Sequence, residues 1–539
     1  MNLFDVICDR TQSERFRTAI LEGATDWDYS RLIDTAERVT QHILKNVATD
    51  PAHPPRLALL AKNSADLAAW MLAMARLKGV IVLLTPSAGE NEWAADIKRA
   101  GVTHVVVSQP FHQKIRLSLR NNWLSEIPVL EFEKVPFESY DGSLAVPKPF
   151  QRLPDETYIL LATQGLILPR RFVPFSAHQI EPHIVALRDA LAFTQRDRTM
   201  TSLPWAHPFA LTHAFWLPLL TGASLAIAPT TTGKPLVEFL IGAHLTRIAD
   251  HPRGFLELLT ACRAERFTLP GMTNVIVGLG PLSTALRKIF GMLRISAVHC
   301  LGQTENLWTI AMENPEEASA MGSIRLQPLP AIDFALLEAD GTDSPLAPSQ
   351  TGILATKSPW MMKGYERSHI AAKNKLELQA IEEEAGRLRP FDSKGRFVSN
   401  DIVRIDREKK GVYVSFMGRR EDCLFLGRTA IPGYLLDTAL KSVPGVIEGA
   451  GFPIVTSEGK PALGCAIVKE EAIQLTPNTV LAILTKLLPP QMVPEQIRFL
   501  HQLPRDLGGN VLRSQLRSLI PSLSPTPATP ATPSAASAP

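Results

Sequence analysis

The sequence has few cysteines, and their spacing does not pair them. The chain of 539 residues contains five, at Cys8, Cys262, Cys300, Cys423 and Cys465. An odd and scattered set excludes a disulfide framework and the close pairs of a structural zinc site, and it favours a reducing compartment.

An excess of charge of either sign and a long apolar run are also missing. Lys and Arg number 56 and Asp and Glu number 53, a net charge of +3, so nothing indicates a nucleic acid partner. The most apolar run, 214–229, is interrupted by Pro218 and Gly222 and is too short for a membrane span. The segment Met1–Asp5 does not begin a signal peptide. We therefore expect a cytoplasmic protein without a membrane span.

What the sequence does contain is an alternation of helical and extended patterns, typical of an α/β fold. Apolar residues recur at helical spacing over 64–78 and 92–100, and each stretch is followed by a branched apolar run, at 80–84 and 102–107. Similar runs lie at 225–228 and 275–277, and similar helical patterns lie at 178–191 and 282–293. The chain is too long for one core. We predict a large domain with mostly buried, largely parallel sheets flanked by helices.

Near residue 411 the pattern changes to shorter elements of a small α+β domain. The expected strands are 412–416, 461–468 and 496–500, and the expected helices are 434–441 and 477–488, with Thr476 as N-cap and Pro477 at the first helical position. Ser, Pro, Thr and Ala make up nearly all of 522–539, which we expect to be disordered. The predicted boundaries are 1–418 for the large domain, 419–520 for the small domain and 521–539 for the tail.

The most informative segment is His299-Cys300-Leu301-Gly302-Gln303-Thr304-Glu305. An apolar run over 295–298 leads into a turn at Gly302, which presents an amide, a hydroxyl and a carboxylate in succession. Such a strand end can hydrogen-bond a nucleotide and offer an anionic ligand to Mg²⁺. Taken alone, the segment is better explained as an ordinary polar turn, and the functional interpretation depends on the other segments.

Several blocks, taken in order from about residue 20 to 520, resemble the AMP-forming acyl- and aryl-CoA synthetase superfamily. The blocks are Leu203–Leu211 with Leu217–Ala223 ("P-x-x-H…L-P-L-x-x-G-A"), Val277–Ser283 ("G-G-A-P-L"), His299–Glu305 ("Y-G-x-T-E"), Gly352–Tyr365 ("G-E-L-x-x-x-x-P-x-x-M-x-G-Y"), Gly395–Val403 ("G-W-F-x-T-G-D-L") and Gly418–Arg419 ("G-R-x-x-D"). The resemblance implies a large adenylate-forming-type domain that binds AMP. It also implies a small mobile domain that swings about a hinge at Glu421.

On the acid side, the resemblance implies that His207 lies beside the carboxylate that is activated. Phe209 would wall the acyl pocket, and the main chain near Gly280 would approach the adenine and acyl groups. The alternatives are a core histidine for His207 and an ordinary strand-to-helix turn for Gly280. An apolar wall favours a fatty or aryl acid.

On the nucleotide side, Gln303 would face the nucleotide, Thr304 would contact the α-phosphate and Glu305 would hold Mg²⁺. Asp401 would accept both ribose hydroxyls, and Arg419 would also reach the ribose. The aromatic that stacks on adenine in the family is Leu301 here.

The pattern departs from the family at two positions, and both concern the ATP phosphates. In the run 163–171, Thr163 keeps a hydroxyl and Arg170 keeps a positive charge, but Leu166-Ile167-Leu168 replaces a small, hydroxylated centre. Branched Ile167 tolerates positive φ poorly, so an anion-binding loop is disfavoured. Asn510 stands where the family has a catalytic lysine, and the amide brings no charge.

Three hypotheses follow from the sequence. The first is an acid–thiol ligase that uses ATP and Mg²⁺, forms an acyl-AMP and passes the acyl group to coenzyme A or to the phosphopantetheine of an acyl carrier protein, with Thr304, Glu305, His207 and Asn510 as candidate catalytic residues. The second is a degenerate relative that binds AMP, an acyl-adenylate or a partner enzyme without efficient adenylation. The third performs only the thioester half-reaction.

Overall fold

The computed structural model describes residues 2–47, 55–134, 157–163, 170–315, 324–338, 342–344, 348–366, 390–426, 429–456, 458–505 and 511–519. Asn510, most of the 163–171 loop and the predicted tail lie outside this part of the chain.

The first part of the large domain is built on a six-stranded sheet. Its order is β6-β5-β3-β4-β7-β8, parallel throughout except for the antiparallel pair β7 and β8. The strands are β3 (Arg56–Leu60), β4 (Val80–Leu83), β5 (His104–Val107), β6 (Val129–Glu131), β7 (Ile159–Ala162) and β8 (Phe172–Phe175). The helices that accompany it are α1 (Leu3–Thr11), α2 (Tyr29–Asn46), α3 (Ala65–Leu77), α4 (Glu90–Arg99) and α5 (His112–Asn121).

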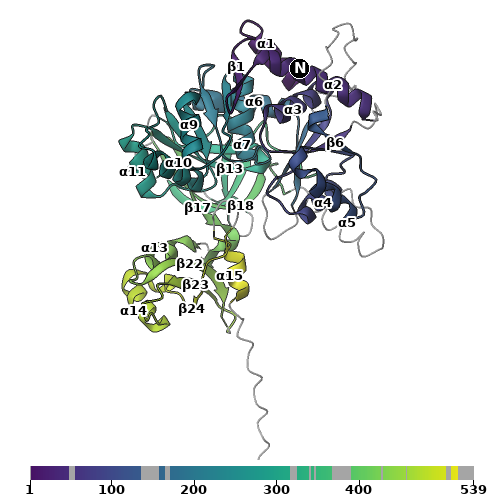
Figure 1. Ribbon diagram of the computed structural model, residues 1–539. Coiled ribbons are helices and arrows are strands. Elements are labelled where there is room, and N and C mark those ends of the chain that lie inside the picture. The colour runs from purple at the N-terminus through teal and green to yellow at the C-terminus, as the bar shows by residue number, and fades with distance from the viewer. Residues whose placement is uncertain are drawn as a thin grey trace, which may run out of the picture.

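A nine-stranded sheet forms the second part, in the order β15-β14-β13-β12-β11-β9-β10-β1-β2. Its strands are β1 (Thr18–Glu22), β2 (Thr25–Asp28), β9 (Arg198–Met200), β10 (Ser224–Ile227), β11 (Arg247–Asp250), β12 (Asn274–Val277), β13 (Ser296–Gln303), β14 (Trp308–Met312) and β15 (Gln327–Pro328). The helices of this region are α6 (Ala177–Ala190), α7 (Pro208–Leu211), α8 (Leu217–Thr221), α9 (Gly233–Ala243), α10 (Pro252–Ala264) and α11 (Thr284–Met292). Figure 1 shows α9, α10 and α11 together on one flank and α4 and α5 on the other.

Strand alternation explains how both sheets are covered on two faces. In β12, Ile276 packs into a core shared with α2, α3, α6 and α8, whereas Val275 and Val277 pack against α9, α10 and α11. In β3, Leu57 and Leu59 join the shared core, while neighbouring positions pack against α4 and α5. Because successive side chains point to opposite faces, a strand buried on both faces must be apolar throughout.

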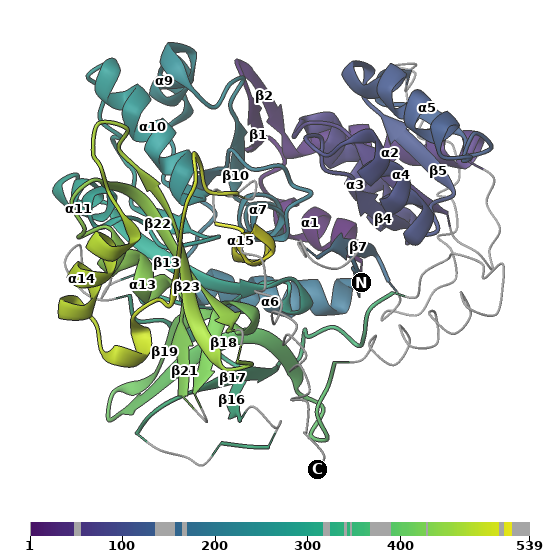
Figure 2. The same ribbon diagram turned by 90° about the horizontal axis from the view of Figure 1, so that it is seen from below.

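A third, four-stranded antiparallel sheet carries the last part of the large domain. It consists of β16 (Asp333–Leu337), β17 (Ser349–Lys357), β18 (Phe397–Glu408) and β19 (Gly411–Arg419) in that order. Figure 1 shows the small domain, green to yellow, below this sheet, and Figure 2 shows the same arrangement from below.

The small domain contains two further sheets, β20 with β21 and β22-β23-β24. Its elements are β20 (Cys423–Leu426), β21 (Thr429–Pro432), α13 (Tyr434–Leu440), β22 (Val446–Val455), β23 (Pro461–Lys469), α14 (Pro477–Leu487), β24 (Gln496–Phe499) and α15 (Arg513–Leu519). Gly433 and Gly451 bring α13 against β22, because a Cβ at Gly433 would lie 2.4 Å from the Gly451 carbonyl oxygen.

Short turns complete the described structure. They are 3₁₀ turns at Gln109–Phe111, Phe132–Lys134, Thr304–Asn306, Arg420–Asp422 and Pro490–Met492, and a π-helical turn at Thr212–Trp216. Among the described helices, none is both long and apolar enough to cross a lipid bilayer.

The predicted α/β class, with a small α+β part at the end, is confirmed. The helix expected over 64–78 is α3, and Thr476 caps α14 by accepting a hydrogen bond from the Thr479 N–H. The strand expected over 412–416 is β19, which pairs with β18 of the large domain rather than with the sheets that follow. The turn Arg420–Asp422 joins β19 to β20, so the predicted hinge residue, Glu421, lies between the two sheet systems. The domain boundaries themselves stay a prediction.

Candidate nucleotide and carboxylate site

Gln303, Asp401 and Arg419 form one connected polar group, which we call the ribose side. Gln303 ends β13, and Asp401 of β18 lies directly opposite Arg419 of β19. The Gln303 side-chain amide donates to Asp401 Oδ2 at 2.9 Å, and Arg419 Nε lies 3.6 Å from Asp401 Oδ1. The Asp401 carboxylate is buried, whereas the Arg419 side chain is 59% exposed. A ligand could therefore approach from the arginine side.

A second layer of hydrogen bonds holds the Gln303 amide in place. Asn306 donates to Gln303 Oε1 at 3.2 Å and to Thr356 Oγ1 at 3.1 Å. Ser358 in turn donates to Asn306 Oδ1 at 2.9 Å. Because the carbonyl end of Gln303 accepts from Asn306, its NH₂ end must face Asp401. The sequence motifs did not reveal this layer.

Glu305 follows Gln303 in the chain, and both its backbone and its side chain accept hydrogen bonds. The Tyr365 hydroxyl donates to Glu305 Oε1 at 2.6 Å, and the Met362 N–H donates to the Glu305 carbonyl oxygen at 2.9 Å. Burial raises the pKa of Glu305, and the charge of Asp401 raises it further, while Tyr365 and Arg419 act in the opposite direction. Glu305 therefore lies within electrostatic range of Asp401 and Arg419.

One carboxylate beside a nucleotide is the usual protein share of a Mg²⁺ site in phosphate-handling enzymes. Mg²⁺ takes one or two protein carboxylates and completes its shell with water and phosphate oxygens. No cluster of three or more His, Cys, Asp or Glu suited to a metal occurs within the described ranges. The single Glu305 carboxylate therefore fits the share that a protein gives to a Mg²⁺ ion bound together with a phosphate ligand.

His207 has one ring nitrogen committed and the other without a partner. It caps α7, and its Nδ1 accepts the Phe209 N–H at 3.1 Å, which places the ring proton on Nε2. That Nε2 is buried and makes no hydrogen bond within the described part of the chain. Burial, with a smaller contribution from His251, lowers the pKa of His207 to about 3, so the ring is neutral. The side chain therefore offers a single N–H donor for which the described residues supply no acceptor.

Phe209 and Trp308 form an aromatic wall next to His207. The Trp308 ring meets the His207 ring edge-on at 4.9 Å between centroids and the Phe209 ring at 5.9 Å. Each aromatic occupies the space that a glycine leaves: a Cβ at Gly302 would lie 2.5 Å from Trp308 Nε1, and one at Gly278 would lie 2.7 Å from the Phe209 ring.

Trp308 is held in a strained backbone conformation. Its φ is +87°, and that of the preceding residue, Leu307, is +58°. Residues other than glycine rarely adopt a positive φ, and each one that does costs on the order of 1–3 kcal/mol of conformational free energy. Trp308 also pairs across the sheet with Gln303, so the aromatic wall is joined to the ribose side. Sequence reasoning missed Trp308, because no motif marks it.

The turn that contains Gly280 is anchored by a buried charged network. His299 Nε2 accepts the Leu282 N–H at 3.1 Å, and its Nδ1 donates to Glu313 at 2.6 Å. Arg287 pairs with the same carboxylate at 2.6 Å. Burial alone would raise the pKa of Glu313, but its bonds to His299 and Arg287 outweigh that effect and lower it. His299, the first residue of the 299–305 block, thus positions the turn that contains Gly280.

Thr163, Arg170 and Arg171, which we call the phosphate side, flank the altered loop. The Thr163 N–H donates to the Arg171 carbonyl oxygen at 2.8 Å, and the Arg171 N–H donates to Thr163 Oγ1 at 3.1 Å. The predicted phosphate contact, Arg170, is engaged elsewhere: its guanidinium lies 3.1 Å from Asp96 of α4. Thr304 is buried at the end of β13, and no described bond of its side chain assigns it a role.

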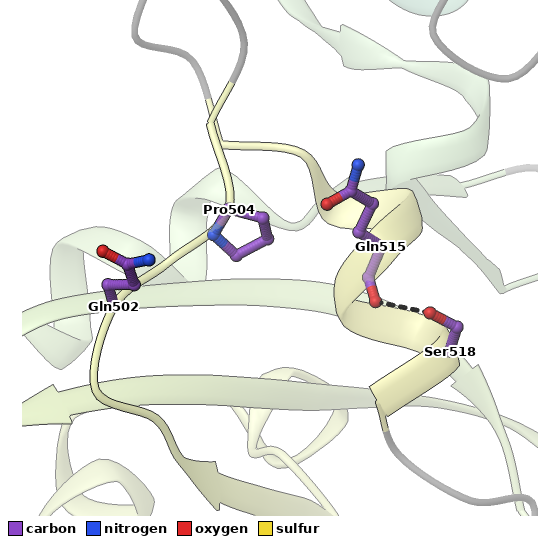
Figure 3. Close-up of a pocket in the computed structure, with 4 residues that line it drawn as sticks. All are labelled: Gln502, Pro504, Gln515 and Ser518. Atoms are coloured by element: carbon purple, nitrogen blue, oxygen red, sulfur yellow. Dashed lines mark hydrogen bonds between the residues drawn. The ribbon is translucent and has the colours of Figure 1, made fainter.

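A shallow hollow lies apart from these groups, on the small domain. Figure 3 shows its lining, Gln502, Pro504, Gln515 and Ser518, with the Ser518 hydroxyl donating to the Gln515 carbonyl oxygen at 2.8 Å. The lining residues that the structure describes are uncharged.

The fold and this combination of residues define a nucleotide-binding enzyme class, and comparison with known proteins identifies the family. The chain belongs to the AMP-binding enzyme family, whose model matches residues 9–366. The resemblance drawn from the motifs is therefore confirmed.

The similar proteins span nearly the whole chain at low identity. The 2-succinylbenzoate–CoA ligase of Geobacillus sp. (strain WCH70) is 24% identical and covers 86% of this chain and 88% of its own length. The indoleacetate–CoA ligase of Aromatoleum aromaticum is 22% identical and covers 96% and 98%. The ATP-bound structure of MatB from Rhodopseudomonas palustris has a TM-score of 0.78 at 20% identity and covers 96% and 99%. At this identity the structural likeness shows the fold alone.

Proposed function

We propose that the protein is an ATP-dependent, AMP-forming ligase that joins a carboxylic acid to a thiol. The observation that carries the proposal is the juxtaposition of the ribose side, Glu305 and the unpartnered His207 N–H, linked through Trp308. Membership of the AMP-binding enzyme family and the names of the relatives support the same reaction class.

In the proposed reaction, His207 Nε2–H donates to one oxygen of the substrate carboxylate and orients it. The other carboxylate oxygen attacks the α-phosphorus of ATP, and pyrophosphate leaves, which gives acyl-AMP. Glu305 would hold the Mg²⁺ that neutralises phosphate charge, Thr304 would face the α-phosphate, and Asp401 and Arg419 would bind the ribose. Gln303 orients Asp401, and the Gly280 main chain lies at the adenine and acyl groups.

In the second step a thiolate attacks the acyl carbonyl carbon and AMP leaves. The thiol belongs to coenzyme A or to the phosphopantetheine of an acyl carrier protein. The small domain would turn about Glu421 between the two steps, as the family resemblance implies. Asn510 would face the site in the first of these positions.

We propose an aryl acid as the substrate, ahead of a fatty acid. Offset or edge-on stacking against aromatic rings favours a flat ring. The wall of Phe209 and Trp308 supplies two such surfaces beside the His207 donor. The relatives named above are ligases for 2-succinylbenzoate and indoleacetate.

A second candidate function is binding of AMP or an acyl-adenylate without efficient adenylation. It is favoured by the Arg170–Asp96 ion pair, which directs the predicted phosphate cation to α4. The apolar Leu166-Ile167-Leu168 segment and Asn510 favour it too.

Pyrophosphate–ATP exchange across a panel of aryl, fatty and short acids, with AMP binding measured by calorimetry, separates the two functions. We expect exchange with at least one aryl acid and measurable AMP binding. AMP binding without exchange for any acid would leave the second function in place, and no AMP binding would contradict both.

A further inference from the structure

The side chains of two adjacent arginines at the end of the altered loop, Arg170 and Arg171, contact different parts of the protein. Arg170 lies 3.1 Å from Asp96 Oδ2 and 3.7 Å from Glu92 Oε2, both on α4. Asp96 is only 4% exposed, so Arg170 neutralises a buried carboxylate. Removal of one partner of such a pair leaves an uncompensated buried charge, which is costly. Arg170 therefore has a structural task on the outer face of the six-stranded sheet.

Arg171 instead lies against the residue that contacts Glu305. Its guanidinium carbon is 4.9 Å from the centre of the Tyr365 ring, and the Tyr365 hydroxyl donates to Glu305 Oε1 at 2.6 Å. The contact is set by the backbone, since the Glu366 N–H donates to the Phe172 carbonyl oxygen at 2.8 Å. Arg56 holds Glu366 by an ion pair at 2.7 Å, which keeps this segment beside β8.

We propose that Arg171, and not Arg170, supplies the positive charge that meets the β- and γ-phosphates of ATP. The assignment rests on the proposed function and names the cation of its phosphate side. The Arg171 side chain also hydrogen-bonds Tyr365. A guanidinium carries five N–H donors in a planar fork, and this fork matches phosphate oxygens in a bidentate manner. Tyr365 would therefore serve as a positioning residue that sets Arg171 next to the Glu305 metal ligand.

The test compares ATP and AMP affinities, with Mg²⁺, in wild type and three variants by calorimetry. Arg171→Gln removes the charge, and Arg171→Lys keeps it. The matched control is the double variant Arg170→Gln/Asp96→Asn, which neutralises both partners of the other pair so that no buried carboxylate is left alone. Thermal unfolding midpoints check that each variant folds.

We expect Arg171→Gln to weaken ATP binding about tenfold while AMP binding changes less than about twofold, because only the triphosphate reaches the charge. Arg171→Lys should lie between wild type and Arg171→Gln, and the control should match wild type. An unchanged ratio of ATP to AMP affinity in Arg171→Gln, with AMP still bound, would overturn this assignment alone. A lower ratio in the control variant would reassign the role to Arg170. Failure of wild type to bind either nucleotide would overturn the proposed function together with it.

Discussion

On the ribose side of the candidate site, the polar side chains form a chain of hydrogen bonds. Ser358 supports Asn306, which orients the Gln303 amide toward Asp401. On the phosphate side, Arg170 is drawn away to α4, and the central loop residues are apolar. Buried polar networks are costly to leave half-satisfied, so a network of this kind persists only when all its members remain. A site with one closed network and one altered loop can retain AMP affinity while its handling of pyrophosphate changes.

The largest expected effect is a loss of stability at low pH, which would unfold the ribose side and the phosphate side together. Burial lowers the pKa of His207 and His213 to about 3 and that of His183 to about 4. Below pH 6.5 the unfolded chain binds protons that the folded chain does not, so the free energy of unfolding falls as the pH falls toward 4. The three histidines contribute roughly 4 kcal/mol per pH unit at full slope.

Carboxyls with a raised pKa, such as Glu22 and Asp66, offset part of that slope. Urea unfolding at pH 7, 6 and 5 measures the net effect, and His213→Gln should reduce the slope by about 1.4 kcal/mol per pH unit. The same slope in this variant and in wild type would contradict the assignment of a buried neutral imidazole.

The next largest effect tests the ribose side. Asp401→Ala should weaken AMP binding by roughly 10- to 100-fold, because a charge-assisted acceptor is lost and the Gln303 amide is left without its partner. Asp406→Ala is the matched control, since Asp406 lies on the same strand and pairs with Arg404 near the surface. Calorimetric affinities that agree for the two variants would show that the ribose is placed wrongly.

A smaller effect is expected from restoring a positive charge for the ATP phosphates, which would make the phosphate side more like that of the family. Asn510→Lys should raise pyrophosphate–ATP exchange about tenfold, because a preorganised cation stabilises the charge that develops on the phosphates. Asn510→Gln, which adds length without charge, should leave exchange unchanged. Equal exchange in all three proteins would show that the small domain presents a different residue in the adenylation step.

The smallest effect concerns the aromatic wall. Trp308→Gly relieves a positive φ but removes a stacking surface, so the KM for an aryl acid should rise about fivefold while short acids are affected less. Trp123→Gly is the control, because Trp123 has a φ of +59° and is 90% exposed. Steady-state kinetics with both acids measure the effect, and a KM for the aryl acid that stays at the wild-type value would remove Trp308 from the acyl site.

Much of the fold could be predicted because the local signals were strong. The apolar spacing over 64–78 corresponds to α3, and the Thr476-Pro477 pair marks the start of α14. The motif residues Gln303, Glu305, Asp401 and Arg419 could be selected because each lies in a short block with recognisable neighbours. Their convergence is a property of the folded chain, since β13, β18 and β19 belong to two different sheets.

Other features had no local signal. Two arginines in succession read alike in the sequence, yet Arg170 contacts α4 and Arg171 contacts Tyr365. Tyr365 ends one of the motif blocks, and no role was predicted for it. Its hydroxyl donates to Glu305, and the next residue, Glu366, hydrogen-bonds β8 through the backbone. Trp308 combines a positive φ with a ring that lies over Gly302 and edge-on to His207, and neither feature has a signal in the sequence.

The amino-acid sequence alone determined the fold class, the family resemblance and the residue types at the nucleotide site, because periodicity and ordered motifs are local properties of the chain. The tertiary structure decided which charges meet. Ion pairs and hydrogen bonds act over a few ångströms in space, and residues such as Arg171 and Tyr365 come within that range only after their strands have been packed.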